Sequence, residues 1–108
     1  MIAWNVNYHK KAEKDLAALD VSVAARVIKA INKVAKNPLP QSAGGYGKPL
    51  GNKSSSKLAG CLKIKMKNDG LRVVYQLVRE DEVMKVIIVS VRDGSAVYRE
   101  AERRINLE

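Results

Sequence analysis

Residues 61–78 read CLKIKMKNDGLRVVYQLV, two strand-like segments separated by Asn-Asp-Gly. An extended segment projects alternate side chains to opposite faces. The strand predicted from Leu62 to Lys67 therefore sends its apolar side chains into a core and aligns three lysines, Lys63, Lys65 and Lys67, in water. Asn-Asp-Gly is typical of a hairpin turn. This stretch thus predicts a β-hairpin with a row of cations on one face.

The return strand of the hairpin is predicted from Leu71 to Val78. Its alternation places Arg72 and Gln76 on one face and the residues Leu71, Val73, Tyr75 and Leu77 on the other. The hairpin therefore presents polar groups from both of its strands, next to an apolar face that requires covering.

A third strand and a final helix follow the hairpin. Val83 to Val91 is rich in β-branched residues and is predicted to be a central strand, and the pattern becomes helical from Ser95 onward. The turns between the three closing strands are too short for parallel crossovers. A mainly antiparallel meander is therefore expected in this half of the chain.

The part before the hairpin predicts one strand and two amphipathic helices. Residues 2–7 alternate between apolar and polar, as in a strand with one buried face, and residues 9–19 have helical spacing. Asp20 or Ser22 caps a second helix, which ends before Pro38 because proline keeps the preceding residue extended. The apolar stripe of this helix consists of Val23, Val27, Ile31 and Val34.

A long loop is predicted at residues 38–57, which contain three prolines, four glycines and a run of three serines. We expect this loop to be mobile. It has no acidic residue but carries Lys48, Lys53 and Lys57, so it either meets a polyanion or an acidic partner, or is a solvated connector.

Together these elements predict one α+β domain over residues 1–108, with the order β-α-α-β-β-β-α. It would contain a mainly antiparallel sheet of about four strands, flanked by two N-terminal helices and a short C-terminal helix.

Cys61, the single cysteine, is expected to be a small core residue and cannot form an intramolecular disulfide, which fits a reducing cytoplasm. No apolar run approaches the roughly 20 residues that span a bilayer, and no signal peptide is visible. A cytoplasmic protein without a membrane partner is expected.

Charge gives the first indication of function. The chain has 20 basic and 11 acidic residues, a formal charge of +9, and ten of the basic residues lie between Val21 and Asn68, where no acidic residue occurs. Such an imbalance favours a polyanionic partner.

Several catalytic chemistries lack the residues that they need. One histidine and one cysteine far apart do not resemble a zinc site, and there is neither a phosphate-binding glycine-rich loop nor a G-x-S-x-G motif. His9, beside two lysines, is interpreted as a solvated histidine. No metal and no cofactor is expected.

Four short motifs carry a resemblance to a known family: Lys63-Ile-Lys65, Gly70-Leu-Arg72-Val-Val-Tyr-Gln76, Val91-Arg92 and Ala96-Val-Tyr98. In this order they resemble the RelE/ParE superfamily of bacterial toxins from toxin–antitoxin systems, on the RelE side. The Gly-x-Arg-x-x-Tyr hairpin is similar across the superfamily. The two lysines, the second arginine and the late tyrosine resemble its endoribonuclease branch, whose members cut mRNA in the ribosomal A site without a metal.

The resemblance implies a role for each matching residue. Arg72 and Arg92 would stabilise charge on the phosphate, and Lys63 would add to it. Lys65 and Tyr98 are the candidate proton-transfer groups, with the choice of base left open, and Arg92 is either an acid or an electrostatic clamp. RNA binding is expected from Lys48, Lys53, Lys57, Lys67 and Gln76.

The expected partners are the ribosome with its mRNA and a cognate acidic antitoxin that wraps the toxin, with operator DNA bound only through the antitoxin complex.

Two other functions stay open: a ParE-like toxin that acts on DNA gyrase without nuclease activity, and a non-catalytic basic RNA-binding module. Simpler readings also exist for single residues, since Arg72 could pair with Asp69 or Glu80 and Tyr98 could be a packing residue with a wet hydroxyl. Asp93, directly after Arg92, could neutralise it.

Overall fold

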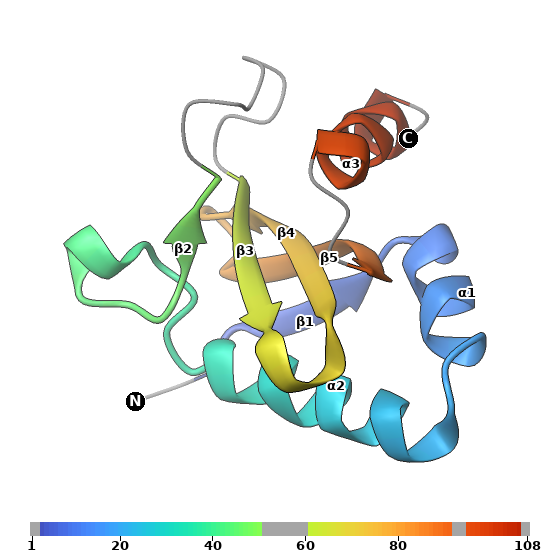
Figure 1. Cartoon of the computed structure of the whole chain (residues 1–108). Helices are drawn as coiled ribbons and strands as arrows, with labels where there is room; N and C mark the ends of the chain where they lie inside the picture. The colour runs from blue at the N-terminus through green and yellow to red at the C-terminus, as the bar shows by residue number, and fades with distance from the viewer. Residues whose placement is uncertain (1–2, 51–60, 92–94, 107–108) are drawn as a thin grey trace.

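The computed structural model describes residues 3–50, 61–91 and 95–106, in which five strands form a single mixed sheet (Figure 1). The strand order is β1-β5-β4-β3-β2. The elements are β1 (Asn5–Tyr8), α1 (Lys10–Ala17), α2 (Val21–Val34), η1 (Gln41–Ala43), β2 (Lys48–Pro49), β3 (Cys61–Met66), η3 (Lys67–Asp69), β4 (Leu71–Val78), β5 (Val83–Val91) and α3 (Ser95–Asn106).

The predicted α+β class and the antiparallel meander are confirmed. Strands β3, β4 and β5 pair antiparallel in chain order, and β1 adds to the outer edge of β5 in parallel. Strands β4 and β5 have the predicted bounds, and β5 lies between two neighbours as a central strand should. The hairpin turn ends at Gly70, whose φ of 66° lies in the left-handed region that glycine adopts without strain.

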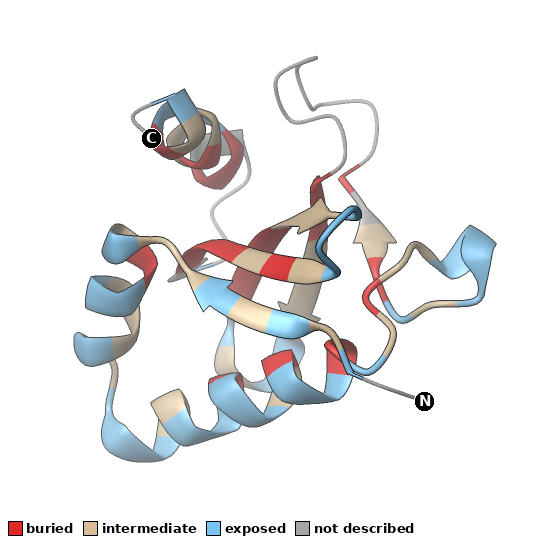
Figure 2. Cartoon of the chain, turned by 180° about the vertical axis from the view of Figure 1, so that it is seen from behind, coloured by how far each residue is buried: buried red, intermediate tan, exposed pale blue. Residues whose placement is uncertain are grey.

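One face of the sheet is covered by α1 and α2, as the sequence pattern requires. Of the predicted stripe on α2, Val27, Ile31 and Val34 are buried and Val23 is partly buried. They pack with Leu62 of β3 in the main apolar core, and Figure 2 shows the buried residues of α2 turned toward the sheet. Asp20, rather than Ser22, caps α2, accepting a hydrogen bond from the Ser22 N–H.

The other face of the sheet carries α3 and a smaller apolar cluster. Val97, Tyr98 and Ala101 of α3 pack here with residues that include Val74 and Cys61. Cys61 is a buried core residue, as predicted, and burial raises the pKa of its thiol to about 11. The sheet thus separates two apolar layers.

The described part of the predicted long loop contains two short elements that the sequence pattern did not predict. η1 is a single 3-10 turn, and β2 is a two-residue strand that pairs Lys48 with Lys63 of β3. The buried hydroxyl of Tyr75 donates a 2.8 Å hydrogen bond to the carbonyl oxygen of Pro38. Gly47 lies against this hydroxyl so closely that a Cβ atom would collide with it. Contacts from β4, rather than local sequence pattern, therefore shape this segment. Residues 51–60 lie outside the described residues.

His9 is a structural residue, and its interpretation as a solvated histidine is wrong. Its Nδ1 accepts a 3.1 Å hydrogen bond from the backbone N–H of Lys11, which caps α1, and its Nε2 lies 3.2 Å from the carbonyl oxygen of Arg104. The neutral tautomer with its proton on Nε2 satisfies both contacts. The ring therefore joins the start of α1 to α3, a tertiary contact that neighbouring lysines do not reveal.

Candidate functional site

Arg72 and Tyr98 form a buried pair between β4 and α3. Only 8% of Arg72 and 6% of Tyr98 is exposed. Arg72 Nη1 donates a 2.6 Å hydrogen bond to the Tyr98 hydroxyl, and its guanidinium carbon lies 5.4 Å from the centre of the tyrosine ring. The fold thus brings together two residues that lie 26 positions apart in the sequence and that were both predicted to belong to one site.

Two simpler interpretations, an ion pair of Arg72 with Asp69 and a wet Tyr98 hydroxyl, do not fit the geometry. Asp69 accepts hydrogen bonds from Arg26 of α2, at 2.7 Å from Nη2, so it is engaged elsewhere than Arg72. This contact with Arg26 also lowers the pKa of the Asp69 carboxyl. The Tyr98 hydroxyl is hydrogen-bonded inside the protein rather than wet.

One donor of Arg72 is unpaired among the described residues. Its Nε is buried and has no hydrogen-bond partner within residues 3–50, 61–91 and 95–106. A buried polar atom is normally paired, and guanidinium groups bind oxyanions through two neighbouring N–H groups. This donor therefore distinguishes Arg72 from an arginine whose hydrogen bonds are fully used inside the fold.

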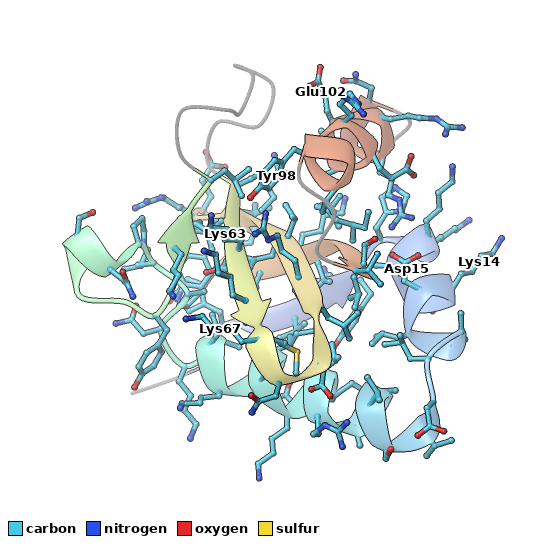
Figure 3. The ribbon with its side chains drawn as sticks, in the orientation of Figure 1. Lys14, Asp15, Lys63, Lys67, Tyr98 and Glu102 are labelled. Atoms are coloured by element: carbon cyan, nitrogen blue, oxygen red, sulfur yellow. The ribbon has the colours of Figure 1, made fainter. Side chains whose placement is uncertain are left out.

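Lysines from two neighbouring strands extend the site. Lys65 of β3 lies opposite Arg72, and Lys63 lies opposite both Val74 of β4 and Lys48 of β2. Directly opposed side chains project to the same side of a sheet. Lys48, Lys63, Lys65 and Arg72, which we call the basic face, therefore share the side of the sheet on which α3 lies. Figure 3 shows Lys63 on β3 and Tyr98 on α3, together with Lys67 at the far end of β3.

The remaining predicted site residues are less central. Lys67 is exposed and belongs to η3, at the turn of the hairpin. Gln76 lies opposite Cys61, four residues along β4 from Arg72, or about 13 Å at the usual rise of a strand. The structure therefore does not bring Gln76 to the Arg72–Tyr98 pair. Arg92, Lys53 and Lys57, as well as Asp93, lie outside the described residues.

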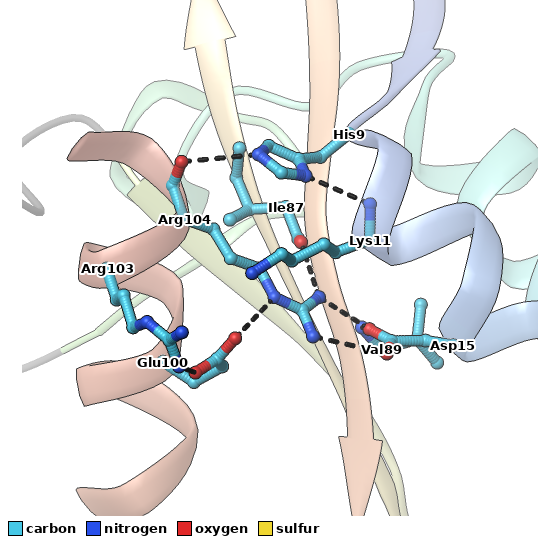
Figure 4. Close-up of polar contacts among 8 residues, drawn as sticks. All are labelled: His9, Lys11, Asp15, Ile87, Val89, Glu100, Arg103 and Arg104. Carbon is cyan, nitrogen blue, oxygen red and sulfur yellow. Dashed lines mark hydrogen bonds and ion pairs between the residues drawn. The ribbon is translucent and has the colours of Figure 1, made fainter. Parts of the chain in front are cut away.

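Sequence reasoning missed a second polar centre, in which Arg104 of α3 contacts Asp15 of α1 and Glu100 of its own helix (Figure 4). Asp15 and Arg104 are 89 residues apart, and neither belongs to a recognisable motif. The helical pattern of α3 offered one signal, because Arg104 falls on the same helix face as Val97 and Ala101, which are both buried.

Two kinds of feature are absent from the described residues. No group of three or more His, Cys, Asp or Glu side chains there could hold a metal ion. None of the helices seen in this part of the chain has the length and apolar character needed to cross a membrane.

The fold and the site define a class of protein: a small, strongly basic α+β domain that presents a buried arginine–tyrosine pair and a row of lysines on one face of its sheet. The family described as "ParE toxin of type II toxin-antitoxin system, parDE" matches residues 6–98. The chain is also 31% identical, over 104 residues, to the mRNA interferase toxin RelE of Escherichia coli K12. The aligned residues cover 96% of this chain and 99% of the relative. The chain therefore belongs to the RelE/ParE superfamily and is a RelE-like toxin of a toxin–antitoxin system.

Solved structures agree with this assignment. A mutant of E. coli toxin RelE in the free state superposes with a TM-score of 0.74 at 28% identity, covering 96% of this chain and 99% of that one. A mutant of the same toxin in complex with an antitoxin RelBc peptide gives a TM-score of 0.67 at 27% identity, with 93% and 95% of the two chains covered. The predicted RelE-like fold is thereby confirmed.

Proposed function

We propose that this toxin domain is a ribosome-dependent endoribonuclease that cuts mRNA in the ribosomal A site without a metal and so inhibits translation. The observation that carries the proposal is the buried Arg72–Tyr98 pair beside the lysines of β3. The relative from E. coli K12 is named an mRNA interferase. The residue types at the site, their positions in the fold and the similarity to an mRNA interferase therefore all favour mRNA cleavage.

The proposed reaction begins with attack of a ribose 2′-oxygen on the adjacent phosphorus. A base removes the 2′-hydroxyl proton as the new O–P bond forms, and the bond from phosphorus to the 5′-oxygen breaks as an acid protonates that oxygen. The products are a 2′,3′-cyclic phosphate and a free 5′-hydroxyl. Charge on the phosphate oxygens increases on the way to the transition state, so fixed cations accelerate the step.

Arg72 is suited to stabilise the phosphate in this reaction. Its charge is permanent, its Nε donor has no acceptor among the described residues, and burial strengthens its interaction with an anion. Lys63 adds positive charge from the neighbouring strand, and Arg92 is proposed to do the same or to act as the acid. The protein supplies this field before the substrate arrives, so little reorganisation is needed during the reaction.

Tyr98 and Lys65 are the proposed proton-transfer groups. Because the Tyr98 oxygen accepts the Arg72 N–H, the phenol proton is directed away from Arg72 and can be donated to a phosphate or leaving-group oxygen. The same N–H would stabilise negative charge on that oxygen if Tyr98 acted as the base. Lys65, opposite Arg72, is the alternative base.

A cognate antitoxin is proposed as the controlling partner, because an unrestrained nuclease of this kind would stop the translation of its host. A mutant of the E. coli relative has been solved in complex with an antitoxin RelBc peptide. With a formal charge of +9, this chain should prefer an acidic antitoxin segment that orders on the basic face. Operator DNA would be bound only through the antitoxin complex.

The test is primer extension on translating ribosomes programmed with a defined mRNA. Wild-type protein should produce cuts within A-site codons. Tyr98→Phe and Arg72→Lys should each reduce the cutting rate by about 100-fold or more, the usual cost of removing one group that stabilises the transition state. Tyr46→Phe is the matched control, because Tyr46 is 53% exposed. Undiminished cutting by a folded Tyr98→Phe/Arg72→Lys double variant would exclude this site.

A gyrase-directed toxin is the second candidate, since the matching family is described by the ParE name. It predicts no mRNA cuts and instead a loss of supercoiling when the protein is added to gyrase and relaxed plasmid. A basic module without catalysis predicts neither effect, and its growth inhibition would be unchanged by Tyr98→Phe. Running both assays on the same preparation separates the three functions.

A further inference from the structure

Arg104 anchors α3 to the body of the domain through a buried network (Figure 4). Its Nη1 and Nη2 donate to the two carboxylate oxygens of Asp15 at 2.6 and 3.2 Å, and its Nε donates to Glu100 at 2.8 Å. Nη1 also donates to the carbonyl oxygen of Ile87 at 3.0 Å. Only 7% of Arg104 is exposed. The two-pronged contact with Asp15 fixes both the position and the orientation of the guanidinium.

The network uses an irregular part of β5. Val74 of β4 pairs with Ile88 and Tyr75 pairs with Val86, so Ile87 is an extra residue in a β-bulge. Its carbonyl oxygen thereby becomes an acceptor for Arg104. Strand β1 ends opposite Val86, and beyond this point the carboxylate of Asp15 accepts the backbone N–H of Val89 at 3.0 Å. Asp15 therefore ties α1, β5 and α3 together.

Arg104 and Tyr98 lie on the same short helix. They are six positions apart, or about 9 Å along the helix axis. Apart from Tyr98, the described side chains of α3 that belong to the smaller apolar cluster are Val97, Ala101 and, in part, Ile105. Apolar contacts over so small a surface have no preferred direction, so they let a helix slide or rotate. Directional hydrogen bonds such as those of Arg104 resist these movements more strongly. The placement of the Tyr98 hydroxyl on Arg72 thus depends on the anchor at the other end of α3.

We propose that Asp15 and Arg104 are positioning residues that hold α3 in the register at which the Tyr98 hydroxyl meets Arg72. The proposal rests on the proposed nuclease function for its catalytic consequence, although its structural part stands without it. Neither residue belongs to the basic face. Their effect on cleavage would pass through Tyr98, whose displacement by about 1 Å is enough to cost roughly 100-fold in rate.

The experiment compares Asp15→Asn and Arg104→Lys with Arg103→Ala. Arg103 is the matched control because it is the neighbouring arginine, also contacts Glu100 (3.4 Å), and has 67% of its side chain exposed. The first readout is the NMR signal of the Tyr98 ring in tyrosine-labelled protein, assigned with Tyr98→Phe. In both anchor variants this signal should shift toward its position in Arg72→Lys, and in Arg103→Ala it should not.

The second readout is single-turnover cleavage on programmed ribosomes. The anchor variants should lose about 100-fold in the maximal single-turnover rate, while the toxin concentration at half-maximal rate stays within about twofold, because the lysines proposed to bind RNA are untouched. In a Tyr98→Phe background, Asp15→Asn should give no further loss, since both changes act on the same group. A general loss of structure would lower the residual rate further.

The outcomes separate this proposal from the nuclease assignment. If wild-type protein does not cut mRNA, the proposed function fails. The NMR signal of Tyr98 then tests by itself whether Asp15 and Arg104 position this residue. An unchanged Tyr98 signal in either folded anchor variant overturns the positioning role, whatever the cleavage assay gives. If Asp15→Asn does not fold, the Tyr98 signal of Arg104→Lys tests the positioning role, because this variant retains the positive charge beside Asp15.

Discussion

Within the described part of the chain, the hydrogen-bonding partner of the buried cation Arg72 is the Tyr98 hydroxyl rather than a carboxylate. Burying a charge without a counter-charge costs stability, and its retention requires a compensating use. Binding a phosphate is such a use, because the ligand then supplies the missing charge. At the residue scale, the site thus combines a cost to folding with a gain in reactivity.

This trade-off predicts that Arg72→Met leaves the free energy of unfolding unchanged or raises it by about 1 kcal/mol, while abolishing mRNA cleavage. Urea unfolding followed by circular dichroism measures the first quantity, and primer extension measures the second. Tyr46→Phe should change neither. A loss of more than about 2 kcal/mol in Arg72→Met would mean that Arg72 is retained for stability.

The sequence could identify a site residue where its position follows from neighbouring residues, and not where a distant residue determines it. The alternation in β3 and β4 gives Lys63, Lys65 and Arg72 one face, since side-chain direction follows from strand geometry alone. The role of Tyr98 came only from the family resemblance, because its partner is 26 residues away. Nothing in the sequence pointed to Asp15, and the helix face of Arg104 did not reveal its partner, since a tertiary contact between α1 and α3 creates their pairing.

At the scale of elements, predictability followed the same rule. Strands β4 and β5 were predicted with their observed bounds because short turns and β-branched residues mark them. Strand β2 was not predicted, because two residues carry no periodicity. It pairs with β3 in a segment where Tyr75 contacts Pro38 and Gly47 passes close to the Tyr75 hydroxyl. The position of Lys48 on the basic face therefore depends on a buried tyrosine.

Tyr75→Phe tests this dependence. The variant removes the hydrogen bond to the Pro38 carbonyl, so the protein should lose about 1 kcal/mol in its free energy of unfolding, as expected for a carbonyl left without a donor. Urea unfolding measures the loss. Burial raises the pKa of Tyr75, so wild-type stability should decrease above about pH 10, where the unfolded chain begins to ionise, and Tyr75→Phe should remove that contribution. Equal stability of Tyr75→Phe and wild type at pH 7 would contradict the role of this bond.

At the scale of the whole molecule, the formal charge of +9 governs encounters with nucleic acid and with the antitoxin. The basic face concentrates part of this charge beside the Arg72–Tyr98 pair. Lys14 points outward from α1, away from Lys63 and Tyr98 (Figure 3). The two sets of lysines should therefore contribute differently to binding.

Salt titration separates these contributions. The logarithm of the affinity for programmed ribosomes should fall linearly with the logarithm of salt concentration, and Lys48→Ala should reduce the slope by about 0.7 if Lys48 neutralises one phosphate of a single strand. Lys14→Ala should leave the slope unchanged. Equal slopes for wild type and Lys48→Ala would remove Lys48 from the RNA-binding surface.

The most direct test of the account is a single-atom change in the substrate. After the cut has been mapped on programmed ribosomes, the mRNA is resynthesised with a 2′-deoxynucleotide immediately before the scissile phosphate, and cleavage by the wild-type protein is measured again. We predict that cleavage at this position disappears, because the attacking oxygen is gone, and that the cut all-ribose mRNA carries a 2′,3′-cyclic phosphate on one product and a 5′-hydroxyl on the other. Continued cleavage of the deoxy-substituted mRNA at the same bond would contradict it.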